Sequence, residues 1–198
     1  MKSIRVLSVA ALALPVALAA QQPAPAPQQP PANPITLAFK NSGARYARWL
    51  TAAFDSIPAA KYGYKPTPVQ QTIGYVAQHL EGANYSLCGV FGGVKATMTA
   101  KDSLADTVKA NWPKDTLVAR LKASFVFCDS AMARVDDAKL SDQVPVGPPA
   151  AGRTAVRALY VLGYVTDLVD HYSQIANYMR LNGMIPPSAL PRPGRGGE

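Results

Sequence analysis

Two histidines and one aspartate are the residues of this chain best placed to do chemistry together. The chain has only two histidines, His79 and His171, and they are far apart in the sequence. Asp167 lies four residues before His171, so on a helix these two side chains occupy one face on adjacent turns. Two imidazoles and one carboxylate with open positions suit a divalent ion such as zinc, iron(II), nickel or manganese. The spacing predicts a metal site if the helices carrying His79 and Asp167 face each other.

A purely structural interpretation of the same residues is also open. A carboxylate and a histidine four residues apart commonly form a simple pair on a helix, and His79 can be a satisfied core histidine. The spacing alone favours this structural interpretation. Burial invites a shared role, because a buried ionisable group is costly unless it is paired or metal-bound. Around His171 the polar Asp167 and Gln174 interrupt a face that otherwise looks core-like: Val156, Leu159, Gly163, Tyr178 and Leu181. We interpret the face of His79 as inward too, since it continues through Thr72, Tyr75, Val76, Ala83 and Ser86.

The segments that carry these residues have helical spacing. Apolar residues recur every three to four positions over long stretches, and strand or hairpin signals are nearly absent. A capping box of Thr67 and Gln70, with Pro68 at the first helical position, predicts the start of the second helix. We expect helices over residues 35–55, 67–91, 113–135 and 154–182. The first and third should bury Phe39, Tyr46, Leu50, Phe54, Leu117, Leu121, Phe125 and Met132.

These four helices have the proportions of a four-helix bundle, since about 20 residues make a helix about 30 Å long. The expected fold class is therefore all-α. The connection over residues 92–112 is long enough to run the length of the bundle. The second and third helices can then lie parallel, which gives an up-down-down-up order.

Cys88 and Cys128 are the only cysteines, so a single intramolecular disulfide can form. It would close a loop of about 40 residues and stabilise the fold by about 4 kcal/mol; two buried free thiols are the alternative. In an antiparallel hairpin the two cysteines would be offset by about 18 Å along the helices, whereas a disulfide needs Cα atoms within about 7 Å. The disulfide and the parallel order therefore support each other.

The two ends of the chain differ from the helical region. Residues 1–20 have Lys2 and Arg5, then an uncharged apolar stretch ending in small residues, which predicts a secretory signal peptide cleaved after Ala19 or Ala20. We expect a Pro/Gln/Ala-rich linker over 21–35, one domain over 36–188 and a disordered basic tail over 189–198. No later segment approaches the roughly 20 apolar residues of a membrane span. The sequence thus predicts a periplasmic or secreted protein that is not membrane-integral.

The net charge argues against nucleic-acid binding. It is +8, and falls to +6 when Lys2 and Arg5 are removed with the signal peptide. The remaining basic residues are scattered along the chain, whereas a nucleic-acid binder gathers them on one face. We interpret the charge as a solvated basic surface.

Two stretches around the histidines resemble a known family. They are IPAAKYGYKPTPVQQTIGYVAQHLEGANYSLCG and, far downstream, DHYSQIANYMRLNGMIPPS. Their order, separation and flanking prolines are similar to those of the exported branch of the DinB-like superfamily of metalloenzymes, over residues 37–188. The name implies neither polymerase activity nor DNA binding. The resemblance implies a four-helix bundle with a long second connection.

The resemblance also implies a ligand set. Members typically bind a divalent metal through a histidine of the second helix and an HxxxH pair on the fourth. His79 matches the first ligand, His171 matches the second histidine of the pair, and Gln174 matches a following glutamine. The chain departs from the pattern at Asp167, where the family has the other histidine. Three outcomes stay open: a two-histidine-one-carboxylate site, a weaker site, or a lost one.

Two functions follow as hypotheses. The first is a metal-dependent enzyme, hydrolase or thiol-transferase-like, acting on an unknown small molecule; the thiol chemistry is implied by characterised relatives. The second is a non-catalytic binding or structural module, with a homodimer as one form of it. Tyr62, Tyr64 and Trp112 would support the module as surface aromatics, although such residues also pack loops onto a bundle.

Overall fold

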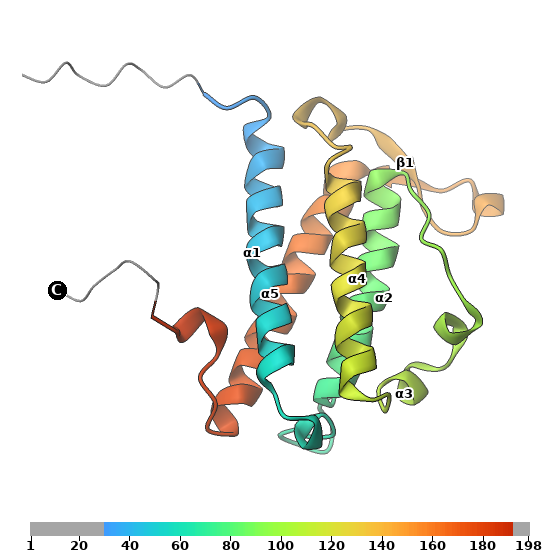
Figure 1. Cartoon of the computed structure of the whole chain (residues 1–198). Helices are drawn as coiled ribbons and strands as arrows, with labels where there is room; N and C mark the ends of the chain where they lie inside the picture. Colours follow the sequence, from blue (N-terminus) through green and yellow to red (C-terminus); the bar gives the residue numbers. More distant parts are fainter. Residues whose placement is uncertain (1–29, 192–198) are drawn as a thin grey trace, which may run out of the picture. The chain divides into compact units, whose positions relative to one another are not determined.

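Four long helices make up most of the residues that the computed structural model describes, 30–191 (Figure 1). They are α1 (Pro34–Ser56), α2 (Ile73–Gly92), α4 (Lys114–Met132) and α5 (Arg157–Leu181). A short helix, α3 (Asp106–Lys109), lies between α2 and α4, and β1 (Gln143–Pro145) pairs antiparallel with β2 (Thr154–Val156). Single 3₁₀ turns occur at Ala59–Lys61, Ala100–Ser103, Asp137–Lys139, Pro149–Ala151 and Pro187–Ala189. The expected all-α class is confirmed.

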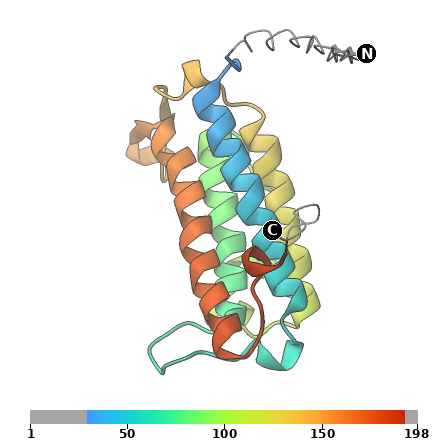
Figure 2. The ribbon, with the colours of Figure 1, turned by 90° about the vertical axis from the view of Figure 1, so that its left-hand side faces the viewer.

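The helices α2 and α4 run in the same direction, while α1 and α5 run the opposite way (Figure 1). Of all the helix pairs, α2 and α4 make the most extensive contact, and α5 lies beside α2 in both ribbon views (Figure 2). The connection over residues 93–113 returns along the bundle, so that α4 can start at the end where α2 also starts. This arrangement brings Cys88 and Cys128 to disulfide distance, with their Cα atoms 5.2 Å apart.

The core is built by one face of each long helix. The predicted stripe of α4 is buried as expected, and so are two of the four residues predicted for α1, Leu50 and Phe54. Phe39 and Tyr46 are only half-buried at the edge of the core. The largest fully buried side chains of α2 and α5 are Ile73, Leu80, Phe91, Leu168, Ile175, Tyr178 and Met179.

The predicted start of the second helix is wrong. Thr67 and Gln70 bond to each other in a turn, through backbone atoms at 3.2 Å and side chains at 3.1 Å. The cap is Thr72, whose hydroxyl accepts from the backbone N–H of Tyr75 at 3.1 Å. The first two N–H groups of the helix bond to carbonyls of the preceding loop: Ile73 donates to Tyr64, and Gly74 donates to Tyr62. The loop must therefore fold back before the helix can begin.

The predicted inward stripe of the last helix is also shifted. Its first member, Val156, ends β2 and is 41% exposed, because residues 154–156 pair with β1 instead of starting the helix. Leu159 and Leu181 are 62% and 57% exposed. Of the predicted stripe only Tyr178 is fully buried, and the buried face is centred one to two positions further along. Its members are Val161, Tyr164, Val165, Leu168, Tyr172, Ile175, Ala176, Tyr178 and Met179. Asp167 and His171 consequently flank the core and do not lie within it.

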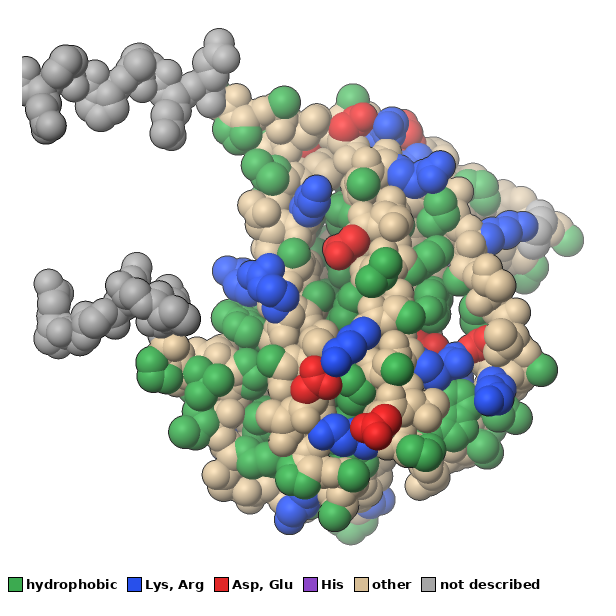
Figure 3. Space-filling model, viewed as in Figure 1, with side chains coloured by type: hydrophobic (Ala, Val, Ile, Leu, Met, Phe, Trp, Pro, Cys, Tyr) green, Lys and Arg blue, Asp and Glu red, His purple; other side chains and the backbone are tan. Residues whose placement is uncertain are grey.

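The predicted terminal segments fall mostly outside the described residues. The signal peptide over 1–20 lies wholly outside them, as do most of the linker over 21–35 and residues 192–198 of the tail. The last two linker positions, Pro34 and Ile35, belong to α1. Among residues 30–191 no helix is long and apolar enough to cross a membrane. On the face shown in Figure 3, Lys and Arg side chains are scattered among acidic ones.

Candidate metal centre

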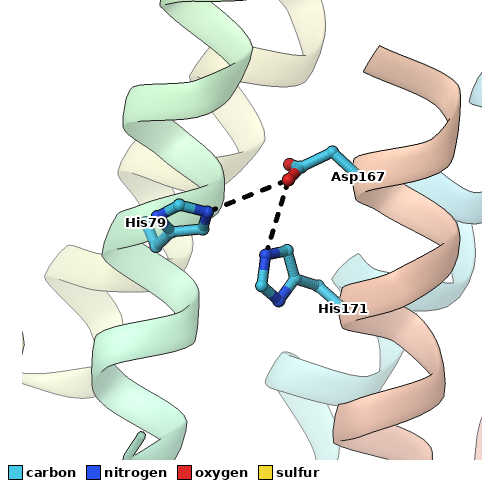
Figure 4. A group of neighbouring side chains, drawn as sticks. All are labelled: His79, Asp167 and His171. Carbon is cyan, nitrogen blue, oxygen red and sulfur yellow. Dashed lines mark ion pairs between the residues drawn. The ribbon is translucent and has the colours of Figure 1, made fainter. Parts of the chain in front are cut away.

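His79, Asp167 and His171 come together between α2 and α5 (Figure 4). Oδ1 of Asp167 lies 3.8 Å from Nε2 of His79 and 3.5 Å from Nε2 of His171. The two imidazole rings meet edge to face with centroids 4.8 Å apart. One ligand atom from each of the three residues lies within 4.8 Å of the others. This is the convergence that the predicted metal site requires.

The site lies at the edge of the bundle and opens toward solvent on one side. The exposed fraction of the side chain rises from 11% for His171 to 24% for Asp167 and 37% for His79. The predicted inward face of His79 is only partly buried: Val76 is buried, Ser86 is exposed and the other members are half-buried. The Tyr75 ring lies parallel to that of His79, with centroids 6.4 Å apart. A ligand could reach the site from the side of α2.

The two oxygen atoms of the Asp167 carboxylate have different surroundings. Oδ1 faces both imidazoles, whereas Oδ2 is buried and has no hydrogen-bond partner among residues 30–191. Burial by itself raises the pKa of this carboxyl, but the neighbouring imidazoles of His171 and His79 outweigh it and hold the pKa at about 2. An ionised carboxylate with an unpartnered buried oxygen is a ready ligand for a cation.

The imidazole of His171 is held on its other side as well. Its Nδ1 lies 3.0 Å from Oε1 of Gln174, and Nε2 of Gln174 donates to the hydroxyl of Tyr178 at 3.0 Å. Burial lowers the pKa of His171, but the contacts with Asp167 and Gln174 outweigh burial and raise it above its ordinary value. Contacts of this kind orient a metal-binding histidine through its second nitrogen.

A hollow of about 460 Å³ opens beside His171. It is formed by the end of the loop before α2 and by one face of α5, and its walls are mostly polar. They consist of Gln70, Gln71, Asp170, His171, Ser173, Gln174, Asn177 and Tyr178. A small polar molecule in this hollow would touch His171 directly.

Comparison with known proteins places this chain in a family. The family model of the DinB superfamily matches residues 44–175, which include all three site residues. The chain belongs to the DinB superfamily. A search of curated proteins gave no match.

Solved structures show the same fold. A DinB-like protein from Bacillus cereus ATCC 10987 is 17% identical, with a TM-score of 0.57, over 76% of this chain and 95% of its own. A conserved protein from Enterococcus faecalis is 15% identical, with a TM-score of 0.55, over 74% and 95% of the two chains. At these identities the likeness extends to the DinB fold alone.

The donor set of this DinB chain is suited to a divalent ion. The DinB superfamily is commonly metal-binding, and the group of His79, Asp167 and His171 in this chain could hold a metal. Two imidazole nitrogens and a carboxylate oxygen are ligands that zinc and other divalent transition metals accept. The buried Asp167 oxygen without a partner points to the same interpretation. Asp167 thus stands where the resemblance predicted a histidine, and its geometry still fits a shared ion.

The sequence did not reveal every residue around the site. The sequence placed Tyr178 on the face of His171, but only as a core residue. Its role as a hydrogen-bond donor could not be predicted, because the acceptor lies in a loop that is distant in the sequence. That hydroxyl donates to the backbone carbonyl of Gln71 at 3.2 Å. The spacing His171, Gln174, Tyr178 on one helix face was the available signal.

Proposed function

We propose that His79, Asp167 and His171 bind one divalent metal ion, and that the chain is a metal-dependent enzyme acting on a small molecule. The observation that supports this is the convergence of three ligand atoms within 4.8 Å, in which Oδ1 of Asp167 faces both imidazoles. The buried Oδ2 of the same carboxylate has no partner among residues 30–191. Zinc, nickel, iron(II) and manganese are the candidate ions.

The roles of the residues follow from their positions. When bound, a divalent ion supplies Lewis-acid activation of a substrate group or of water. Asp167 supplies the negative charge of the site, and His171 is oriented through Gln174. The exposed side of His79 leaves access for a substrate, and the hollow beside His171 offers it a polar binding wall.

Hydrolysis and thiol transfer are the two reactions that we propose to distinguish. Cys88 and Cys128 are buried and at disulfide distance from each other, so neither offers a free thiol. A thiol transfer would therefore take its thiol from a second substrate, whereas hydrolysis needs only water. An assay with and without a small thiol separates them.

A non-catalytic module is the second candidate. It is favoured by Asp167, because the carboxylate already pairs with both imidazoles without any other partner. The aromatic residues that could have formed a binding surface give it less support. Tyr62 is buried, and Tyr64 and Trp112 pack their rings against the core.

We also propose that the protein is exported. The cysteine pair at disulfide distance is compatible with an oxidising compartment, and the N-terminal sequence fits a signal peptide. Alkylation of unfolded protein without a reductant should label neither Cys88 nor Cys128. Labelling of both would contradict the bridge.

Metal content tests the main proposal. Purified protein should bind one equivalent of zinc, nickel or manganese and melt at a higher temperature with it. His79→Ala and Asp167→Ala should lose both effects. Asp170→Ala is the matched control, because Asp170 is an exposed carboxylate on the same helix. Wild-type protein that takes up no divalent ion and shows no thermal shift would refute the enzyme and leave the module.

A further inference from the structure

Three consecutive hydrogen bonds, which we call the relay, run from His171 to the loop between α1 and α2. The relay passes from Nδ1 of His171 to Oε1 of Gln174, from Nε2 of Gln174 to the Tyr178 hydroxyl, and from that hydroxyl to the carbonyl of Gln71. The distances are 3.0, 3.0 and 3.2 Å. Tyr178 is only 1% exposed, so water does not compete for its hydroxyl.

The carbonyl at the loop end of the relay fixes the direction of all three hydrogen bonds. A backbone carbonyl only accepts, so the Tyr178 hydroxyl donates its single proton to Gln71. The hydroxyl can then only accept from Gln174, which must turn its NH₂ group toward Tyr178 and its carbonyl oxygen toward His171. That oxygen also only accepts, so Nδ1 of His171 carries a proton.

We infer that Gln174 and Tyr178 are positioning residues that keep the proton of neutral His171 on Nδ1 and leave Nε2 with its lone pair. This Nε2 faces Oδ1 of Asp167 at 3.5 Å. Two electron-pair donors then face each other, an arrangement that favours a cation between them. The inference rests on the proposed metal site, since this lone pair is the one that a divalent ion would use.

The relay also links the two helices of the site. Gln71 directly precedes Thr72, which caps α2, the helix that carries His79. The hydrogen bond from Tyr178 therefore ties α5 to the start of α2. Through this bond, the loop that forms one wall of the hollow contributes to the orientation of a metal ligand.

The substitution Tyr178→Phe tests the inference by removing one hydroxyl. Without that hydroxyl, the Gln174 amide has no fixed orientation, and His171 should partly shift its proton to Nε2. Nitrogen NMR shifts of the metal-free protein, recorded well above the ordinary pKa of histidine, report the tautomer. Calorimetric titration with zinc should show affinity weakened roughly 10- to 100-fold.

A matched control and a rescue separate positioning from mere stabilisation. Tyr62→Phe also removes a buried tyrosine hydroxyl that donates to a backbone carbonyl, that of Phe54 at 2.8 Å, but this hydroxyl takes no part in the relay. It should leave the His171 tautomer and zinc affinity unchanged. Adding Gln174→Glu to Tyr178→Phe should restore the Nδ1 proton, because a carboxylate presents only acceptors whichever way it turns.

A second variant covers the case in which Tyr178→Phe does not fold. Gln174→Leu alters a half-buried side chain outside the core and should shift the tautomer in the same way. The wild-type tautomer and zinc affinity in Tyr178→Phe or Gln174→Leu would overturn the inference. If wild-type protein binds no zinc but the tautomer shifts as expected, the proposed metal site fails while the positioning role stands.

Discussion

At the scale of single residues, Asp167 differs from His171 in being held from one side only. Its Oδ1 lies between the imidazoles and its Oδ2 meets no partner among the described residues. Spacing together with the family resemblance predicted that His79, Asp167 and His171 converge, whereas spacing alone left a purely structural pair open. The two together were not enough to find the role of Tyr178, because its partner, the carbonyl of Gln71, is 107 positions away along the chain.

The charges of the site predict a pH-dependent stability of the metal-free protein. The pKa of Asp167 falls from 3.8 to about 2, so its contribution to stability is present above pH 3.8 and is lost as the pH falls toward 2. The pKa of His171 is raised above 6.5, so its contribution is present below that pH and is lost as the pH rises further. The two groups together should stabilise the folded protein most between about pH 3.8 and pH 6.5.

Asp167→Asn should remove this contribution, on the order of 2 kcal/mol of unfolding free energy. Urea unfolding at a series of pH values measures it. The difference between wild type and variant should be largest at mildly acidic pH and shrink on both sides. Asp170→Asn, which removes an exposed carboxylate with a smaller effect on His171, should show a smaller pH-dependent difference. A difference between wild type and Asp167→Asn that does not vary with pH would contradict the electrostatics described for the site.

At the scale of helices, the sequence correctly predicted which segments form the long helices. It predicted less well where these helices start and which face each of them buries. Thr67 and Thr72 both precede plausible helical sequence, and only the fold-back of the loop onto Ile73 and Gly74 decides between them. On α5, the strand at Thr154–Val156 shortens the predicted helix, and the buried face includes Leu168 and not Asp167. Local spacing carries no information on these tertiary contacts.

The helices α2 and α4 pack closely near their last turns. One turn beyond the cysteine pair, a Cβ atom added to Gly92 would lie 2.6 Å from the Cβ and 2.9 Å from the Cα of Ala131. The helices therefore need a residue without a side chain at this position. At Gly82, earlier in the same helix, an added Cβ meets nothing within 4 Å.

Gly92→Ala should thus destabilise the protein by about 1 to 3 kcal/mol through overpacking against α4. Gly82→Ala should stabilise it by about 0.5 to 1 kcal/mol, because alanine has the higher helix propensity. Thermal or denaturant unfolding of both variants under non-reducing conditions measures the pair. Equal effects of the same sign would show that the contact with Ala131 does not determine the packing of α2 on α4.

At the scale of the whole molecule, an ion cluster fastens the long connection to the bundle. Arg120 on α4 pairs with Glu81 on α2 and with Asp102 in the connection, and its guanidinium lies 4.9 Å from the centre of the Trp112 ring. The side chains of Glu81 and Asp102 are only 6% and 9% exposed. The sequence predicted a connection long enough to allow parallel helices, but it did not show what holds that connection in place.

Arg120→Met should cost about 3 to 5 kcal/mol, since it leaves two nearly buried carboxylates without their cation. Lys122→Met is the matched control. Lys122 pairs with Asp55, and both side chains are about half exposed, so its loss should cost less than about 1 kcal/mol. Denaturant unfolding of the two variants gives the comparison. A small loss for Arg120→Met, equal to that for Lys122→Met, would rule out the cluster as the fastening of the connection.

The most direct measurement for the metal centre is anomalous X-ray scattering from crystals grown with one equivalent of zinc. We predict one strong peak bonded to a nitrogen of His79, a nitrogen of His171 and an oxygen of Asp167, each at about 2.0 to 2.2 Å. The peak should be absent in Asp167→Ala. Zinc bound elsewhere, or no peak between α2 and α5 in the wild type, would contradict the proposal that these three residues share an ion.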